Sequence, residues 1–476
     1  MAAETSTLIH GGTILTAAGQ QRADLLIRGE RIEAVGDVAV AADRVVDAGG
    51  CFVMPGAVDS HTHFAHLSAN GHTRTADDFA TGSRAALAGG TTSYVDFARA
   101  APGEGVLDCF HRRRGEAARD SVADFALHPI VPQSAAHDDS FDQLARLATE
   151  EGATSWKFFM AYHGSMVEDD TLIRGFRLCY RLGVLPMVHA ENGHIVADAI
   201  DTLVAQGRTA EHDHPLGHPE VAEREAIGRA ADLARWCDGP VFVVHVSSAG
   251  GAEVIEHRRA RGEAVLGETC PQYLVASLED YQDLGFEAAA YVCSPPIREA
   301  AHHDGLWRAV RTGALGTVGT DHAAFRMDQP AGLPPQKPQG RGYFPRIPNG
   351  VPGVEERLML LWHFGVGTGM LTPSQFVDRV ATRPARVFGL HPAKGTLAPG
   401  SDADVVVWDP DAERTITSAS ALSAAGYSLY DGLTVRGVPR VVLARGRTVA
   451  EEGRVQADPG RGRYLPRLPF DRTSFL

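Results

Sequence analysis

The chain has 476 residues, with 45 Lys and Arg against 59 Asp and Glu, and therefore a formal net charge of −14. Its 44% hydrophobic and 22% charged residues are typical of a globular protein and exclude a disordered or fibrous one. The acidic balance argues against a nucleic-acid or anionic-membrane partner, because both require a basic face.

Both ends of the chain alternate apolar and polar residues in the way that is typical of short antiparallel strands. Residues 7–53 include LLIRGERIEAVG, and the same texture returns after residue 395 in DADVVVWDP and LTVRGVPRVVLARGRTV. We therefore expect one small β domain formed by residues 1–53 and 395–476, with the rest of the chain inserted between them.

Between these ends, short apolar runs alternate with segments of helical periodicity such as FDQLARLATEEG. The eight runs span residues 53–59, 91–98, 125–131, 155–161, 184–190, 241–247, 264–270 and 315–321. Eight such units match the size of a (β/α)₈ barrel, whereas no G-x-G-x-x-G turn follows an early strand to support a doubly wound open sheet. The sequence predicts an α/β fold with a TIM-like barrel over residues 54–394.

Two segments lack periodicity. Residues 327–348 follow the eighth run, so they form either a substrate-side loop or a surface excursion without a role. The C-terminal RGRYLPRLPFDRTSFL is either an arm that reaches a neighbouring subunit or a frayed end.

The six cysteines show no metal-binding spacing, and no secretion signal or stretch of about 18 apolar residues is present. We expect reduced thiols in a cytoplasmic protein with no membrane partner.

Metal-ligating residue types stand at the ends of four of the apolar runs. VDSHTH contains His61 and His63, two residues apart and so on one side of a strand. His189 ends the fifth run, His245 the sixth, and Asp321 the eighth. Each histidine alone is more often structural, but five such residues at strand ends indicate a metal site, because active sites form there in barrels. Imidazole and carboxylate ligands without Cys suit zinc, or manganese, iron, cobalt or nickel.

The run SWKFFMAY contains Lys157, one of only three lysines in the chain. A buried lysine either snorkels or pairs with an acid, or it loses its proton, because burial disfavours the cation. A neutral amine can capture carbon dioxide as a carbamate, whose two oxygens can bridge two metals. The residues alone do not choose between these alternatives.

The motifs of this chain, in their order, resemble those of the hydantoinase/dihydropyrimidinase family of the amidohydrolase superfamily. They are HTH, WKFFMAYHG, VHAEN, VVHVSS, CSPPIR, GTDHAAF and IPNGVPGVEERL. The similarity extends from MPGAVDSHTHF to ATRPARVFGLHPAKGTLAPGSDADVVVWDP and so covers nearly the whole chain. This resemblance implies a (β/α)₈ barrel, a small β-sandwich built from both termini, and a homo-oligomer of two or four copies.

The resemblance also implies a centre of two Zn²⁺ or other divalent ions. His61, His63 and Asp321 would bind one ion, and His189 and His245 the other. Lys157, as N6-carboxylysine, would bridge both ions together with a hydroxide that attacks the ring amide.

Catalytic and substrate-binding roles follow from the same motifs. Asp321 would carry the proton to the leaving nitrogen, and Tyr162 would donate a hydrogen bond to the developing oxyanion. Ser294 and Asn349 would hold the ring amide through their backbone groups.

One loop departs from the family pattern. Residues 65–76, within FAHLSANGHTRTADDF, replace a shorter and more apolar stretch and include His66 and His72, which are either substrate contacts or solvated loop histidines. The expected activity is opening of a hydantoin or dihydropyrimidine ring to an N-carbamoyl amino acid. The alternatives are an allantoinase, a cyclic imide hydrolase, a dihydroorotase or a non-catalytic scaffold protein. Ala65 argues against a dihydroorotase, because an Arg is usual at that position. The intact ligand set argues against a scaffold protein.

Overall fold

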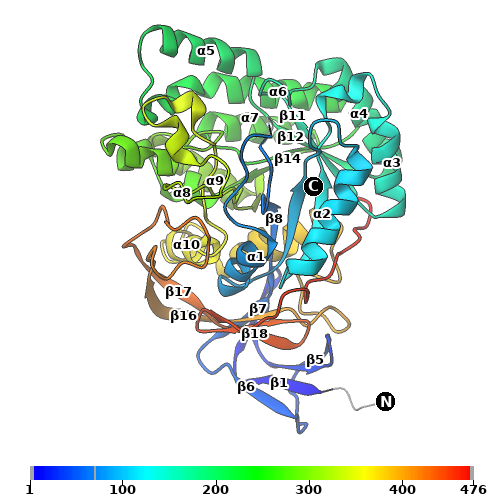
Figure 1. The fold of residues 1–476 in the computed structure, drawn as a ribbon. Helices are drawn as coiled ribbons and strands as arrows, with labels where there is room; N and C mark the ends of the chain where they lie inside the picture. Colours follow the sequence, from blue (N-terminus) through cyan, green and yellow to red (C-terminus); the bar gives the residue numbers. More distant parts are fainter. Residues whose placement is uncertain (1–4, 69–70, 472–476) are drawn as a thin grey trace.

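The computed structural model describes residues 5–68 and 71–471, which form a mixed α/β structure (Figure 1). A central α/β region of parallel strands and helices (residues 57–394) lies above a terminal β region built from residues 5–55 and 395–455 (Figure 1).

The terminal β region consists of two sheets. A four-stranded sheet has the order β5-β4-β1-β6, with bounds Arg31–Gly36, Asp24–Arg28, Ser6–His10 and Arg44–Asp47. A seven-stranded sheet has the order β19-β18-β17-β16-β7-β2-β3, with bounds Arg454–Val455, Arg447–Glu451, Thr434–Ala444, Val405–Thr415, Phe52–Pro55, Thr13–Thr16 and Gly19–Arg22. Because β7 pairs with both β2 and β16, the two ends of the chain share one sheet. Apolar side chains of both sheets, including Ile27 and Val405, form one buried cluster.

Within the described residues, the central region contains eight parallel strands in two sheets. The first has the order β10-β9-β8, with bounds Asp124–Pro129, Thr91–Ala98 and Ala57–Thr62. The second runs from β11 to β15, with bounds Ser155–Phe159, Leu185–His189, Val241–Val243, Val265–Thr269 and Leu315–Val318. Isolated parallel bridges join the two sheets on both sides, from Ile130 to Lys157 and from Thr62 to His322.

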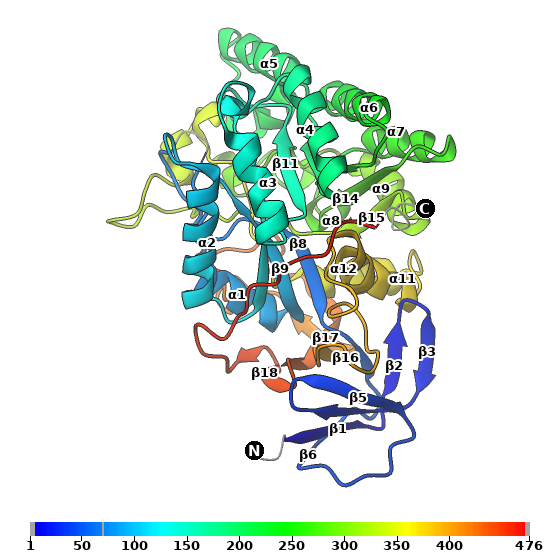
Figure 2. The same cartoon turned by 90° about the vertical axis from the view of Figure 1, so that its right-hand side faces the viewer.

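Helices follow most of these strands and cover the sheets from outside (Figures 1 and 2). The α-helices are α1 Phe79–Ala88, α2 Val106–Asp120, α3 Ser140–Glu150, α4 Asp169–Leu182, α5 Gly193–Ala205, α6 Glu220–Trp236, α7 Ala249–Ala260, α8 Pro271–Val275, α9 His303–Thr312, α10 Arg357–Leu361, α11 Pro373–Val377 and α12 Arg383–Val387. Local signals set their ends: the Asp78 side chain caps α1 at two backbone N–H groups, and Gly183 ends α4 in the left-handed conformation.

The first apolar run, residues 53–59, does not form a single strand. It divides at Gly56 into β7 of the terminal β region and β8 of the α/β region. A Cβ at Gly56 would lie 2.2 Å from Thr92 Oγ1, so the close approach of β9 excludes any side chain there. The chain crosses from one region to the other at this point.

The C-terminal segment packs against its own chain as far as the structure describes it, up to residue 471. Leu465 N donates to Phe125 O, Arg467 N to Gly152 O, and Phe470 N to Gly183 O. The Arg467 side chain is buried, and its Nη2 donates to Leu127 O. Figure 2 shows this red segment passing the parallel strands, so the expectation of a frayed end is wrong for the described residues, whereas an arm that reaches a neighbouring subunit stays a prediction.

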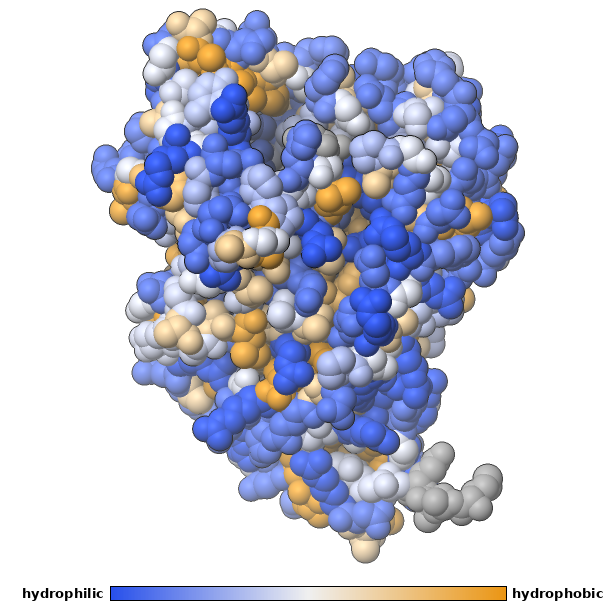
Figure 3. Space-filling view, in the orientation of Figure 1, coloured by the Kyte–Doolittle hydropathy of each residue, from blue (hydrophilic) through white to orange (hydrophobic). Residues whose placement is uncertain are grey.

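The surface seen in Figure 3 is predominantly hydrophilic, with small and scattered apolar patches. Within residues 5–68 and 71–471, no helix is long and apolar enough to cross a membrane. The six thiols are free, and five of them are buried.

Candidate active site

A cavity of about 840 Å³ opens at the carboxyl ends of the parallel strands. Its lining includes all nine residues that the sequence predicts for the site, namely His61, His63, Lys157, Tyr162, His189, His245, Ser294, Asp321 and Asn349. Six of them lie on or just after parallel strands, whereas Tyr162, Ser294 and Asn349 lie in loops, and the ordering of the strands around this edge brings them together.

The first group of potential ligands comprises His61, His63 and Asp321. His61 Nε2 and His63 Nε2 lie 3.1 and 3.0 Å from Asp321 Oδ1, and one ligand atom from each residue lies within 4.8 Å of the others. Burial alone would raise the pKa of Asp321, but His61 and His63 hold it well below its usual range, so the carboxylate is anionic. Burial lowers the pKa of His63 to about 4, leaving a neutral imidazole, the form that binds metals.

The second group comprises His189 and His245. His189 Nδ1 faces His245 Nε2 at 2.9 Å. Burial lowers the pKa of His189 and holds that of His245 well below its usual range. Two neutral imidazoles that converge in this way suit a shared cation.

Lys157 projects from the middle of β11 into the same cavity and is 1% exposed. Its Nζ lies 5.0 Å from the ring centroid of Phe97 and 5.3 Å from that of Phe159. Within the described chain no carboxylate is within ion-pair distance of it, so the alternative in which the lysine pairs with an acid is wrong. Burial lowers the pKa of Lys157 to about 7, and the neutral amine is therefore well populated near neutral pH.

Tyr162, Ser294 and Asn349 lie at the wall of the cavity. The Tyr162 hydroxyl donates to Glu191 Oε2 at 3.2 Å, and Asn349 Nδ2 donates to Ser294 Oγ at 2.7 Å. Burial keeps the pKa of Tyr162 well above its usual value, so the hydroxyl stays protonated and can donate.

The backbone is strained where it presents three of these side chains. Tyr162, His245 and Asp321 have φ of +73°, +39° and +51°, a region that non-glycine residues rarely adopt. Such conformations cost of order 1–3 kcal/mol each and are commonest at functional sites. The fold therefore maintains an unfavourable local geometry at this cavity.

The donor set fits divalent metal ions. Four imidazoles and one carboxylate converge without any cysteine, which suits zinc and related ions. His61 Nε2 is buried without hydrogen-bond geometry to any partner in the described chain, although Asp321 Oδ1 is 3.1 Å away. A cation between these atoms would satisfy both.

The comparisons with known proteins agree with this geometry. The amidohydrolase family profile matches residues 52–449. The D-hydantoinase of Ralstonia pickettii is 42% identical over 97% of this chain and 99% of its own, and the dihydropyrimidinase of Rattus norvegicus is 36% identical over 99% and 90%. The crystal structure of dihydropyrimidinase from Brevibacillus agri NCHU1002 superimposes with a TM-score of 0.94 at 39% identity, covering 98% of this chain and 100% of that one.

The chain belongs to the hydantoinase/dihydropyrimidinase family of amidohydrolases. The resemblance inferred from the motifs is thereby confirmed.

Two buried carboxylates that the sequence analysis missed orient the histidines of this amidohydrolase. Glu268, in β14, accepts from His61 Nδ1 at 2.6 Å, and Glu191 accepts from His189 Nε2 at 2.8 Å. Carboxylates in this position fix the orientation of an imidazole and raise its basicity as a ligand. A signal existed for both: Glu268 lies in a predicted strand, and Glu191 follows His189 by two residues.

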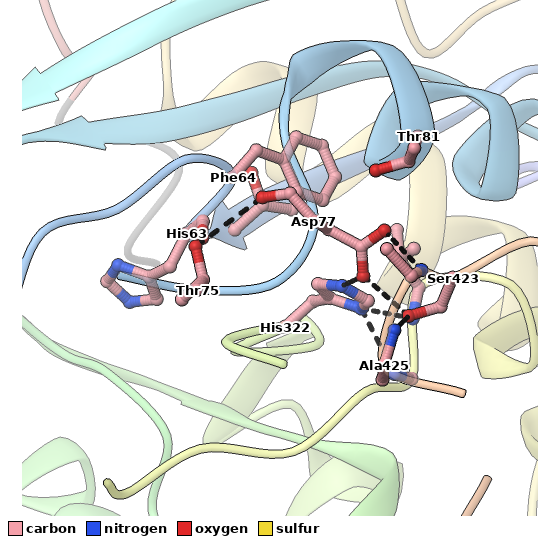
Figure 4. A network of polar contacts seen from close by, with 12 residues as sticks. His63, Phe64, Thr75, Asp77, Thr81, His322, Ser423 and Ala425 are labelled. Carbon is pink, nitrogen blue, oxygen red and sulfur yellow. Dashed lines mark hydrogen bonds and ion pairs between the residues drawn. The ribbon is translucent and has the colours of Figure 1, made fainter. Parts of the chain in front are cut away.

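A polar network behind the first ligand group joins three distant parts of the chain (Figure 4). Asp77 lies 3.0 Å from His322 Nε2 and accepts from Ser423 Oγ and from Ala424 N. Thr75 Oγ1 donates to His63 O at 2.8 Å (Figure 4). The network thus anchors the end of the 65–76 loop, and with it the backbone of His63, to the segment that carries Asp321.

The 65–76 loop contributes to the cavity wall through His66 and His72, while residues 69–70 lie outside the described residues. From the 327–348 loop, the wall receives Gln339 and Arg346 among others. Both loops therefore reach the candidate active site.

Proposed function

We propose that this amidohydrolase hydrolyses the cyclic amide of hydantoins or dihydropyrimidines to N-carbamoyl amino acids. The observation that carries this proposal is the convergence of two histidine-containing ligand groups on one uncompensated buried lysine, in a family whose named relatives are hydantoinases and dihydropyrimidinases.

The architecture that we propose for this activity is a (β/α)₈ barrel over residues 54–394 and a β-sandwich of residues 1–53 and 395–476. The pairing of β7 with β16 and the bridges at both sides of the parallel sheets support it. We propose further that two or four copies assemble, which light scattering on the purified protein would measure.

We propose that His61, His63 and Asp321 hold one divalent ion and that His189 and His245 hold a second. The chemistry that a bound pair of such ions supplies is polarisation of the amide carbonyl and acidification of a water molecule. The lowered pKa values of His63, His189 and His245 and the anionic Asp321 support this assignment, because these side chains present their metal-binding protonation states.

Lys157 would join the two ligand groups as a carbamate. Its neutral amine nitrogen forms a bond to the carbon of CO₂ and releases one proton, which converts the neutral amine into an anion with two oxygens. This reaction requires the free amine, and the depressed pKa of Lys157 supplies it near neutral pH.

The remaining side chains act on the substrate. Asp321 accepts a proton from the attacking water and returns it to the ring nitrogen as the C–N bond breaks. Tyr162 turns its hydroxyl from Glu191 towards the carbonyl oxygen, where charge develops. Ser294 and Asn349 position the ring through their backbone groups.

Metal analysis combined with a substrate panel tests this function. We expect about two divalent ions per chain and loss of ring absorbance with hydantoin or dihydrouracil. Protein that carries its metals but opens neither ring would contradict the proposal.

A further inference from the structure

Arg99 is a cation in the cavity that the proposed reaction does not use. It directly follows β9, and its side chain lines the cavity beside Phe159, Ser165 and His66. Its Cζ lies 4.8 Å from the Phe159 ring centroid, its Nη1 donates to Ser165 Oγ at 3.0 Å, and its Nε donates to His66 Nε2 at 3.3 Å.

All three partners of this guanidinium are neutral. No Asp or Glu among the described residues lies within ion-pair distance of Arg99, whereas the neighbouring Arg112 and Arg113 pair with Glu104 and Asp96. The nearby carboxylates are therefore already engaged. Burial lowers the pKa of Arg99 to about 10, which still leaves it cationic at neutral pH.

The cavity as a whole offers nothing else to neutralise this charge. Asp321 is the only carboxylate among the described residues that line it, and it belongs to the proposed metal site. Arg346, exposed at the rim, adds a second cation.

The unpaired charge discriminates between substituents on a substrate ring. An apolar substituent packed here would remove water from the guanidinium without replacing its hydrogen bonds, which is unfavourable. A carboxylate would form charge-assisted hydrogen bonds, because the planar donors of arginine match its two oxygens.

We infer that the preferred substrates are cyclic ureides whose ring substituent carries a carboxylate, and that Arg99 binds this carboxylate. The inference rests on the proposed ring-opening function and specifies its substrate class. Ser165 and His66 hold the guanidinium in place on one side, while the Phe159 ring supports its face.

Hydantoin-5-acetic acid and hydantoin-5-acetamide form a matched pair, because they have nearly the same shape and differ in charge. We expect the wild-type holoenzyme to show about 10- to 100-fold higher kcat/KM for the acid. Arg99→Met should abolish this ratio mainly through a higher KM for the acid, since the contact is equally present in ground and transition states. Arg99→Lys should retain part of it.

Arg174→Met is the control variant. Arg174 also lies over a phenylalanine ring and donates to a neutral oxygen, but it is on α4 outside the cavity. The acid-to-amide ratio should not change in this variant.

Equal kcat/KM for acid and amide in the wild type, or an unchanged ratio in Arg99→Met, would overturn the inference. If the wild type opens no ring at all, the proposed function fails instead. In that case, calorimetry can still compare the affinities of the wild type and the same variants for N-carbamoyl-aspartate and for N-carbamoyl-asparagine. This comparison decides whether Arg99 selects the carboxylate.

Discussion

Two buried lysines show how the surroundings of one side chain decide its role. Lys394 and Lys157 are both almost completely buried. Lys394 Nζ lies 2.7 Å from Asp124, 2.8 Å from Asp404 and 3.0 Å from Asp402, and these carboxylates raise the pKa of Lys394 although burial alone would lower it. Lys157 has aromatic rings and imidazoles around it, and its pKa falls to about 7.

The difference separates a structural cation from a reactive amine. Lys394 ties β10 of the α/β region to the segment before β16 of the terminal β region, and it stays charged. Lys157 loses its proton readily, as the proposed carbamate formation requires. Lys337 adds a third case: it is buried, its Nζ donates to Val292 O at 3.0 Å, and burial lowers its pKa to about 7, but it is not among the described residues that line the cavity.

Replacement of Lys157 should have the largest effect. Lys157→Ala and Lys157→Arg should lower kcat by on the order of 10³-fold or more and reduce bound metal, because neither side chain can form the carbamate. Metal analysis and ring-opening rates measure this. Short carboxylic acids should partly restore activity to Lys157→Ala only, and wild-type turnover in either variant would contradict the bridging role.

Lys394→Met should affect stability instead of chemistry. It leaves the buried Asp404 without a cationic partner and removes one of the two cations beside Asp124 and Asp402, and loss of one partner of a buried pair costs about 3–5 kcal/mol. Denaturant unfolding of the purified protein measures this loss. Folded Lys394→Met should still bind its metals, and a selective loss of metal with normal stability would reverse the roles assigned to the two lysines.

Glu268→Gln should weaken metal binding about 10- to 100-fold, because the carboxylate orients His61 at 2.6 Å. Competition with a chelator measures the change. Glu150→Gln, at an exposed carboxylate on α3, is the control and should bind metal as the wild type does. An unchanged affinity in Glu268→Gln would show that the imidazole does not depend on this carboxylate.

Lys337→Met should have the smallest effect on activity, because this lysine lies away from the ligands. In the folded state its pKa lies below that of the unfolded chain, so the unfolded state binds more protons between about pH 7 and pH 10 and wild-type stability rises with pH there. The variant should therefore be more stable than the wild type near pH 7, with the gain shrinking towards pH 10. Thermal unfolding at several pH values checks this, and loss of metal in this variant would show that a depressed pKa alone does not distinguish Lys157.

The sequence was sufficient to predict the parallel strands and the side chains that meet in one cavity at their ends, because both follow local rules. Apolar runs mark buried parallel strands, and polar residues at their carboxyl ends meet at one edge. Glu268 and Arg99 were missed because, although Glu268 lies in a predicted strand and Arg99 directly follows one, their roles depend on which side chains turn towards each other, and periodicity does not determine this. The path of residues 463–470 past β10 and the segments before β11 and β12 was also not predictable, since it rests on backbone hydrogen bonds that any sequence can form.

The central claim is that Lys157 is carboxylated within a two-metal centre. Carbon-13 NMR of the holoenzyme prepared with ¹³C-labelled bicarbonate tests it most directly. We predict a carbamate resonance in the wild type and in Lys337→Met that is absent from Lys157→Arg. A fully active wild-type enzyme without this resonance would contradict the account.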